Sequence, residues 1–217
     1  EADAGPDQTY FFSRWGEGDI EYADLNKDGK INPGNNTLDD HGDLSIIGNS
    51  TPRFSYGINL GIDWKNFDLS VFCQGVGKRD AAPSGNMFYG ITGDVWQSSV
   101  FVQHLDYWSP DNPNAYYPKP YLGTNEHSKN TQTQTRFLQN AAYFRLKSFQ
   151  FGYTLPVEKK IKFPIEKIRF FITGENLFTL TKMNKTFDPE TAFVGAYGSG
   201  KAYPLRRTFS FGLNVDL

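Results

Sequence analysis

Five stretches of the chain alternate apolar and polar side chains with a period of two, and this pattern limits the possible folds more than any other feature. In the clearest one, residues 54–64, every even position is apolar or aromatic and every odd position between them is Ser, Gly, Asn or Asp. Successive side chains of an extended chain point to opposite faces, so each stretch is a strand with one apolar and one polar face. We therefore predict an all-β fold. The predicted strands are residues 54–64, 67–74, 143–155, 168–180 and 207–217.

The third predicted strand contains a change of phase. Its apolar positions are Phe144 and Leu146 in the first half but Phe149 and Phe151 in the second half. One extra residue in a strand produces such a shift, so we predict a β-bulge near residues 147–148.

The connections between the predicted strands alternate in length. Residues 65–66 form a two-residue turn, 76–136 is a connection of about sixty residues, 156–167 is shorter, and 182–205 is longer again. Outer-membrane barrels have this asymmetry, with long extracellular loops and short periplasmic turns. Strands of about eleven residues also suit a tilted crossing of a bilayer. We expect antiparallel up-and-down strands of a transmembrane β-barrel, whose other strands lie outside this sequence because five strands do not close.

The composition of the chain excludes several other classes of protein and site. The 22 basic and 24 acidic residues leave no basic surface for nucleic acid. A single cysteine, Cys73, excludes a disulfide framework or a cysteine-ligated zinc site within these residues. It falls on the apolar face of its strand, where we expect a small hydrophobe.

No apolar run is long enough for a membrane-spanning helix. The first residue is Glu1 and no signal-like stretch follows, so we expect a fragment or a processed piece.

Residues 24–32 match a calcium-binding loop of the EF-hand type. Asp or Asn occupies positions 1, 3 and 5, Gly29 occupies position 6, and Ile31 occupies position 8. Position 12 is Asn35 rather than Glu, so a further ligand has to come from Asp39, Asp40 or Asp43. The alternative is an Asx-rich turn without metal. We expect structural Ca²⁺ ahead of Mg²⁺, since all ligands are oxygen. The expected ligand residues are Asp24, Asn26, Asp28, Lys30, Asn32, Asp40 and Asp43.

Four aromatic residues in the longest connection are candidate contacts for a substrate or a lid protein. Exposed rings stack on sugars or bury against a partner, but they can equally pack a loop onto itself. The four residues are Trp108, Tyr116, Tyr117 and Tyr121.

We identify no catalytic site. Residues 195–201 follow the start of a P-loop pattern, but Ala202 replaces the magnesium-binding Ser or Thr, and a flexible loop explains them better. His41, His104 and His127 lack the spacing of metal or catalytic groups, and we expect solvated loop histidines. We therefore expect neither an enzyme nor a catalytic cofactor.

A series of short motifs runs along nearly the whole chain. The motifs occupy residues 48–57 (GNSTPRFSYG), 64–70 (WKNFDLS), 74–80 (QGVGKRD), 107–110 (YWSP), 112–115 (NPNA), 138–147 (LQNAAYFRLK), 152–156 (GYTLP), 174–178 (GENLF) and 203–204 (YP). Each motif is weak alone, but in this order they resemble the C-terminal barrel region of SusC/RagA-type TonB-dependent transporters. One departure is Leu217, because barrels of this class commonly end in Phe.

This resemblance implies the C-terminal quarter of a 22-stranded barrel with a plugged lumen in the outer membrane. Residues 1–53 would form an extracellular loop with the EF-hand-like segment, and 54–217 would form barrel strands and loops. The plug and the TonB-recognition segment would lie outside these residues. Family members import glycans or peptides with a SusD-like surface lipoprotein and with energy from the TonB complex.

The second hypothesis is a soluble, calcium-dependent carbohydrate-binding β-sandwich, which shares the metal-held loop and exposed aromatic residues. A hydrolase comes third, because no paired carboxylates can be placed together.

Overall fold

The computed structural model of the chain describes residues 5–93, 99–122, 125–156, 165–191, 202–203 and 205–216. The chain divides into two compact units. We call the first the loop unit, which comprises Glu1–Gly48, Ala82–Leu138 and Val194–Lys201. The second is the sheet unit, which comprises Asn49–Ala81, Gln139–Phe193 and Ala202–Leu217.

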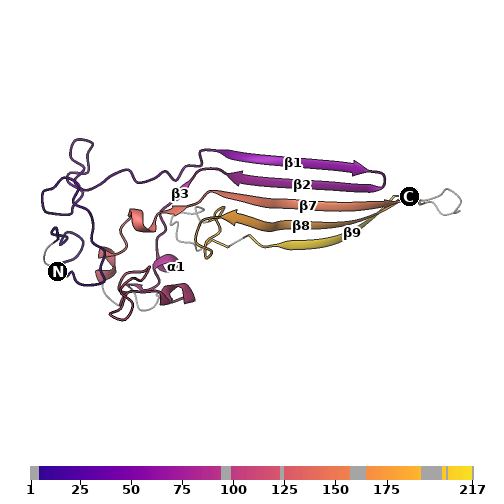
Figure 1. Cartoon of the computed structure of the whole chain (residues 1–217). Coiled ribbons are helices and arrows are strands. Elements are labelled where there is room, and N and C mark those ends of the chain that lie inside the picture. Colours follow the sequence, from indigo (N-terminus) through magenta and orange to yellow (C-terminus); the bar gives the residue numbers. More distant parts are fainter. Residues whose placement is uncertain are drawn as a thin grey trace. The chain divides into compact units, whose positions relative to one another are not determined.

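The sheet unit is built on one antiparallel sheet of five long strands. Each strand pairs with the next long strand along the chain, in the order β1-β2-β7-β8-β9, which is an up-and-down meander (Figure 1). All five predicted strands are present, and their bounds differ from the prediction by a few residues at most. The strands are β1 (Ser55–Trp64), β2 (Phe67–Val76), β7 (Tyr143–Leu155), β8 (Lys167–Thr181) and β9 (Thr208–Asp216).

The pairing register places apolar side chains opposite one another across the whole sheet. A one-residue slip would move every side chain of a strand to the other face, so this alignment fixes the register. One apolar row is Ile62, Leu69, Phe151, Ile172 and Phe211, and the next on the same face is Trp64, Phe67, Tyr153, Phe170 and Leu213. The opposite face carries the row Gly61, Ser70, Gln150, Thr173 and Ser210.

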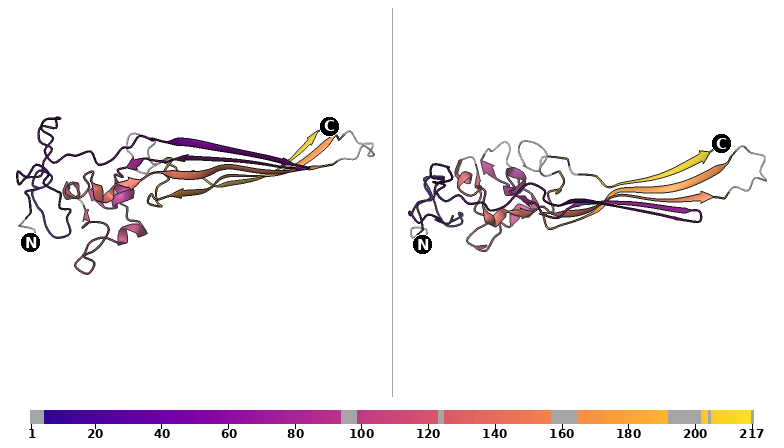
Figure 2. Two further views of the ribbon diagram at one scale, coloured as in Figure 1. Left: turned by 45° about the horizontal axis from the view of Figure 1, so that its top comes forward. Right: turned by 90° about the horizontal axis from the view of Figure 1, so that it is seen from above.

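The sheet is a single twisted layer, which Figure 2 shows in two further views. Its apolar face is open in the described part of the chain: Phe211 is 85% exposed and Leu60 is 57% exposed. A face of this size needs a cover of some kind, because contiguous apolar surface in contact with water is costly.

Both predicted local features of the sheet are present. The turn between β1 and β2 contains Lys65 in the left-handed region, with φ 55°. The predicted bulge is confirmed, since Phe72 and Cys73 are adjacent in β2 but pair with Ser148 and Leu146 in β7. Lys147 is therefore an extra residue in β7.

Glycines on the polar face make room for large neighbours. Gly212 pairs with Phe171, and a Cβ at this glycine would collide with the Phe171 ring. In the same row, Gly152 leaves space for an ion pair in which Arg169 Nε donates to Asp68 Oδ1 at 2.8 Å.

The loop unit has little regular structure. Its short elements are α1 (Asn86–Tyr89), the 3₁₀ helices η2 (Val102–Leu105), η3 (Asn125–Lys129) and η4 (Thr135–Phe137), and the parallel pair β4 (Thr92–Gly93) and β5 (Tyr121–Leu122). Phe88 and Phe137 are almost fully buried at its centre. The sheet unit adds a second small pair, β3 (Asp80–Ala81) with β6 (Gln139–Asn140). None of the helices in the described ranges has the length and apolar character to span a bilayer.

Candidate functional site

The EF-hand-like segment forms a tight loop held by its own carboxylates. Asp24 Oδ1 accepts the Lys27 amide at 2.6 Å, and Asp24 Oδ2 accepts the Gly29 amide at 2.8 Å. Asp28 Oδ1 accepts the Lys30 amide, and Asn26 Nδ2 donates to Asp28 Oδ2. Gly29 has φ 80°, which permits the sharp bend that the motif predicts.

Asp43 closes this loop from outside. Its carboxylate accepts the amide of Leu25 at 2.7 Å and that of Asn32 at 2.9 Å, so it holds both ends of the segment. Asp40 accepts hydrogen bonds from the Asn35 backbone and side chain. Within the described residues, no three Asp, Glu, His or Cys side chains form a group that could hold a metal ion. Because each carboxylate oxygen has two lone pairs, these amide bonds leave acceptor capacity for a cation, and calcium stays a prediction.

A buried ion pair that the sequence did not indicate lies in the loop unit. Lys129 Nζ is 2.7 Å from Asp19 Oδ2, and neither side chain is more than 2% exposed. The ammonium also donates to the Arg14 carbonyl and lies 4.2 Å from the centroid of the Tyr121 ring. Asn130 Nδ2 donates to the second Asp19 oxygen. Since the partners are more than a hundred residues apart, this group joins the N-terminal segment to the long connection.

The four candidate aromatic residues do not form one exposed platform. Tyr117 is only 4% exposed and packs against Phe88 and Phe137, with ring centroids 5.7 and 6.3 Å away. For Tyr117 the structure shows the alternative, a ring that packs the loop onto itself, because it belongs to the core of the loop unit. Tyr116 is half-buried in the same cluster. Tyr121 is half-buried, and its hydroxyl donates to Asp19; Trp108 is also half-buried.

His104 is not the solvated loop histidine that the sequence predicted. It is 5% exposed rather than solvated. Its Nδ1 accepts the Phe101 amide at 3.0 Å, so Nε2 carries the hydrogen and donates to the Phe88 carbonyl at 2.9 Å. Burial lowers the pKa of His104, against the raising effect of the Phe88 and Met87 carbonyls. Gly90, with φ 77°, leaves the space that the imidazole ring needs. His41 is exposed, as expected, and His127 is half-buried.

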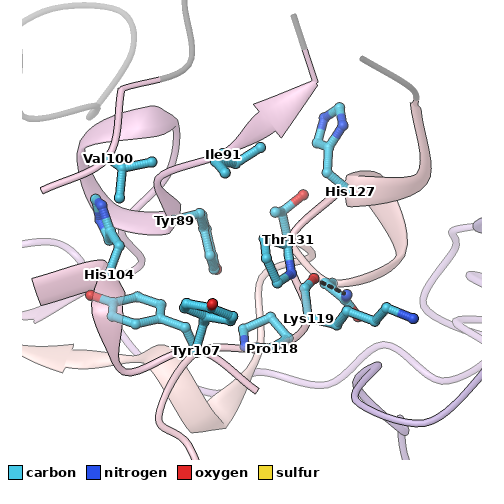
Figure 3. Close-up of a pocket in the computed structure, with 12 residues that line it drawn as sticks. Tyr89, Ile91, Val100, His104, Tyr107, Pro118, Lys119, His127 and Thr131 are labelled. Carbon is cyan, nitrogen blue, oxygen red and sulfur yellow. Dashed lines mark hydrogen bonds between the residues drawn. The ribbon is translucent and has the colours of Figure 1, made fainter. Parts of the chain in front are cut away.

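Beside His104, the loop unit contains a pocket of about 310 Å³. Figure 3 shows Tyr89 from the end of α1, Ile91 from the segment that follows it, Val100 and His104 from around η2, and Thr131 from the segment after η3. Tyr117, from the candidate set, also contributes to its wall. A second, more open pocket of about 560 Å³ is lined by Trp108 and shares the wall of Tyr107, Lys119 and Pro120.

In the sheet unit, residues 182–191 form a segment that we call the strap. Arg145 donates to Asp188 Oδ2 and to Glu190 Oε2, both at 2.8 Å, and to Thr179 Oγ1. Lys147 Nζ donates to Glu190 Oε1 at 2.9 Å. Arg145 is 2% exposed. The strap also buries Met183 and Phe187, so it combines an ionic and an apolar attachment.

Two further predictions concern the P-loop-like residues 195–201 and Cys73. The P-loop-like residues 195–201 lie outside the described residues. Cys73 is half-buried and pairs with Ile58 on the apolar face, as predicted for a small hydrophobe.

Comparison with known proteins gives a consistent result. The chain is 29% identical over 208 residues to TonB-dependent receptor P3 of Formosa agariphila, and 25% identical over 211 residues to TonB-dependent receptor P26 of the same organism. These alignments cover 89% and 91% of the chain but only 18% and 19% of the relatives, so the chain spans about a fifth of their length. No family model matches the chain.

Solved structures agree with the sequence comparison. The structure of the RagAB peptide transporter matches 78% of the chain and 18% of its own chain with a TM-score of 0.60 and 28% identity. The "open-open" state of the RagAB peptide importer matches 83% of this chain and 19% of that one, with a TM-score of 0.59 and 25% identity. These relatives are receptors and transporters rather than enzymes. The resemblance to the barrel region of SusC/RagA-type TonB-dependent transporters, which the ordered motifs indicated, is confirmed.

Proposed function

We propose that the chain forms part of the wall and the extracellular loops of an outer-membrane importer for nutrients. The sheet unit would supply five neighbouring barrel strands, with the apolar rows facing lipid and the polar rows facing the lumen. The transporter would be energised by the TonB complex acting on a segment outside these residues.

The unbroken apolar face carries this proposal. A soluble β-sandwich, our second hypothesis, would cover such a face with another sheet from the same domain. The described residues of the sheet unit form one large layer, in which the outer strands β1 and β9 each have one long-strand neighbour. Barrel closure supplies neighbours for both edges, and lipid supplies the cover.

The proposed partners are those that the family resemblance implies. The remainder of the barrel and its plug would complete the wall, and a SusD-like surface lipoprotein would meet the loop unit. The relatives described as RagAB are peptide transporters, while the family as a whole also imports glycans, so the imported class for this chain is peptide or glycan. Trp108, Tyr116, Tyr117 and Tyr121 remain the proposed contacts with substrate or lid, although Tyr117 reaches a ligand only through the pocket that it lines.

Cysteine labelling in cells that express the full-length protein tests this proposal. A membrane-impermeant maleimide should label Asn125→Cys, in the long connection, and should spare Asn66→Cys, in the short turn. The matched control is Asn66→Cys in lysed cells, where the thiol should react. The protein should also leave the outer-membrane fraction only with detergent. Release without detergent, or labelling of Asn66→Cys alone in intact cells, would contradict the proposal.

A further inference from the structure

We propose that the 310 Å³ pocket of the loop unit is a subsite for a bulky apolar side chain of a peptide. This inference rests on the proposed import function and names a substrate class for one site in it. The pocket is within the size range of small-molecule sites, and three tyrosines, two prolines and two aliphatic residues make most of its wall.

Two polar side chains of the wall, those of Asn130 and His104, are engaged by the protein itself. The side-chain amide of Asn130 donates to Asp19 Oδ1 and to the Lys119 carbonyl, and its oxygen accepts the Ile20 amide. Both nitrogens of His104 are engaged by backbone atoms. Lys119 holds its ammonium group 5.7 Å from the centroid of the Tyr121 ring. Asn130 and His104 therefore have little hydrogen-bonding capacity left for a guest, and aromatic, proline and aliphatic residues make most of the rest of the wall.

This arrangement favours an apolar guest over a sugar. A saccharide carries hydroxyls around its ring, and burying a hydroxyl without a partner costs free energy. A Phe or Leu side chain loses nothing in this way, and its burial away from water is favourable. The rings of Tyr89 and Tyr107 offer it stacking and edge contacts (Figure 3).

The adjoining pocket supports a peptide as the carrier of this side chain. It shares the wall of Tyr107, Lys119 and Pro120, but its lining includes Glu17 and Ser109. Two pockets of different character, side by side, fit a chain whose successive units differ in polarity. Peptides have this property, since each residue carries its own side chain, whereas a glycan presents hydroxyls on every unit.

Two matched variants of the full-length transporter in detergent test the proposal. Val100 lines the pocket and is 54% exposed, so Val100→Trp should fill the cavity from its rim without opening a void. Val102, two residues on and 84% exposed, does not line it, and Val102→Trp is the control. The probes are blocked Ala-Phe-Ala, Ala-Ala-Ala and Ala-Glu-Ala peptides and cellotriose, with affinities measured by calorimetry.

We expect the wild type to bind the Phe peptide at least about tenfold more tightly than the Ala and Glu peptides, a difference of about 1.4 kcal/mol. Val100→Trp should abolish this preference, and Val102→Trp should keep it. Equal affinities for the three peptides, or an unchanged preference in Val100→Trp, would overturn the proposal. Binding of cellotriose that Val100→Trp removes would also overturn it, in favour of a sugar site. These results are independent of the labelling topology, so the subsite and the import function can fail separately.

Discussion

At the scale of single residues, burial was the property that sequence polarity predicted least well. His104 and Lys129 both belong to a loop-rich, polar stretch of the chain, and both are buried. Their partners explain the difference. His104 is held by the backbone atoms of Phe101 and Phe88, and Lys129 by a carboxylate 110 residues away, and no local pattern records such contacts.

The neutral state of His104 predicts a pH dependence for the loop unit. Its pKa is lowered in the folded state, so the unfolded chain binds more protons as pH falls below the ordinary histidine pKa of about 6.5. Stability should be constant above that pH and should decline as pH falls below it, toward the folded-state pKa. Protease resistance of residues 82–138, measured from pH 8 to pH 5 in the full-length protein, checks the sign.

His104→Gln is the control for this measurement. It should be less resistant than the wild type at neutral pH, because the two backbone contacts are imperfectly replaced, but its resistance should vary less between pH 6.5 and pH 5. An equal decline in both proteins would assign the effect to other groups.

At the scale of elements, strands and the bulge followed from the sequence because alternation is a local property. The strap did not, since Asp188 and Glu190 meet Arg145 across more than forty residues. The bulge helps to explain this contact. Residues 145 and 147 both lie on the polar face just before the change of phase, so their side chains converge on Glu190.

Arg145→Met should detach the strap. It leaves the largely buried Asp188 carboxylate without its cation, and removing one partner of a buried pair costs roughly 3–5 kcal/mol. Lys147→Met is the matched control, because Lys147 is 22% exposed and an exposed pair contributes about 0–1 kcal/mol. Trypsin cleavage after the exposed residues Lys182 and Lys185 is the readout. Similar cleavage rates in both variants would mean that Arg145 does not anchor the strap.

For the loop at residues 24–32, we propose that a divalent cation completes the hydrogen-bonded turn. Calcium should slow proteolysis of this segment with a midpoint of about 0.1–1 mM, the range of extracellular calcium modules. Magnesium should act more weakly, since it demands a stricter geometry. The double variant Asp24→Ala with Asp28→Ala should lose the response, whereas Asp111→Ala, at an exposed carboxylate outside residues 24–43, should retain it. A calcium response that survives the double variant would place the ion elsewhere.

At the scale of the whole molecule, the alternation predicted the order of the strands and their division into two faces. The structure of the long connection, residues 76–136, could not be predicted from alternation. Its short elements are held by an aromatic core around Phe88 and Phe137 and by the Asp19–Lys129 pair, and neither has a sequence period. The candidate pocket arises from this packing, so only Tyr117 among its lining residues was in the predicted contact set.

The bulge in β7 changes which positions of the strand, even or odd, face the apolar side of the sheet. Before Lys147 the apolar face takes even positions, Phe144 and Leu146, and after it odd positions, Phe149 and Phe151. Loss of Lys147 would remove the bulge and leave Phe144, Leu146, Phe149 and Phe151 in strict alternation, whereas loss of a residue elsewhere in the strand would move one half of it to the other face. A strand with one apolar and one polar face can gain or lose residues only in pairs, unless a bulge offsets a single residue. Length variation among relatives should therefore be even within strands and unrestricted in the loops between them.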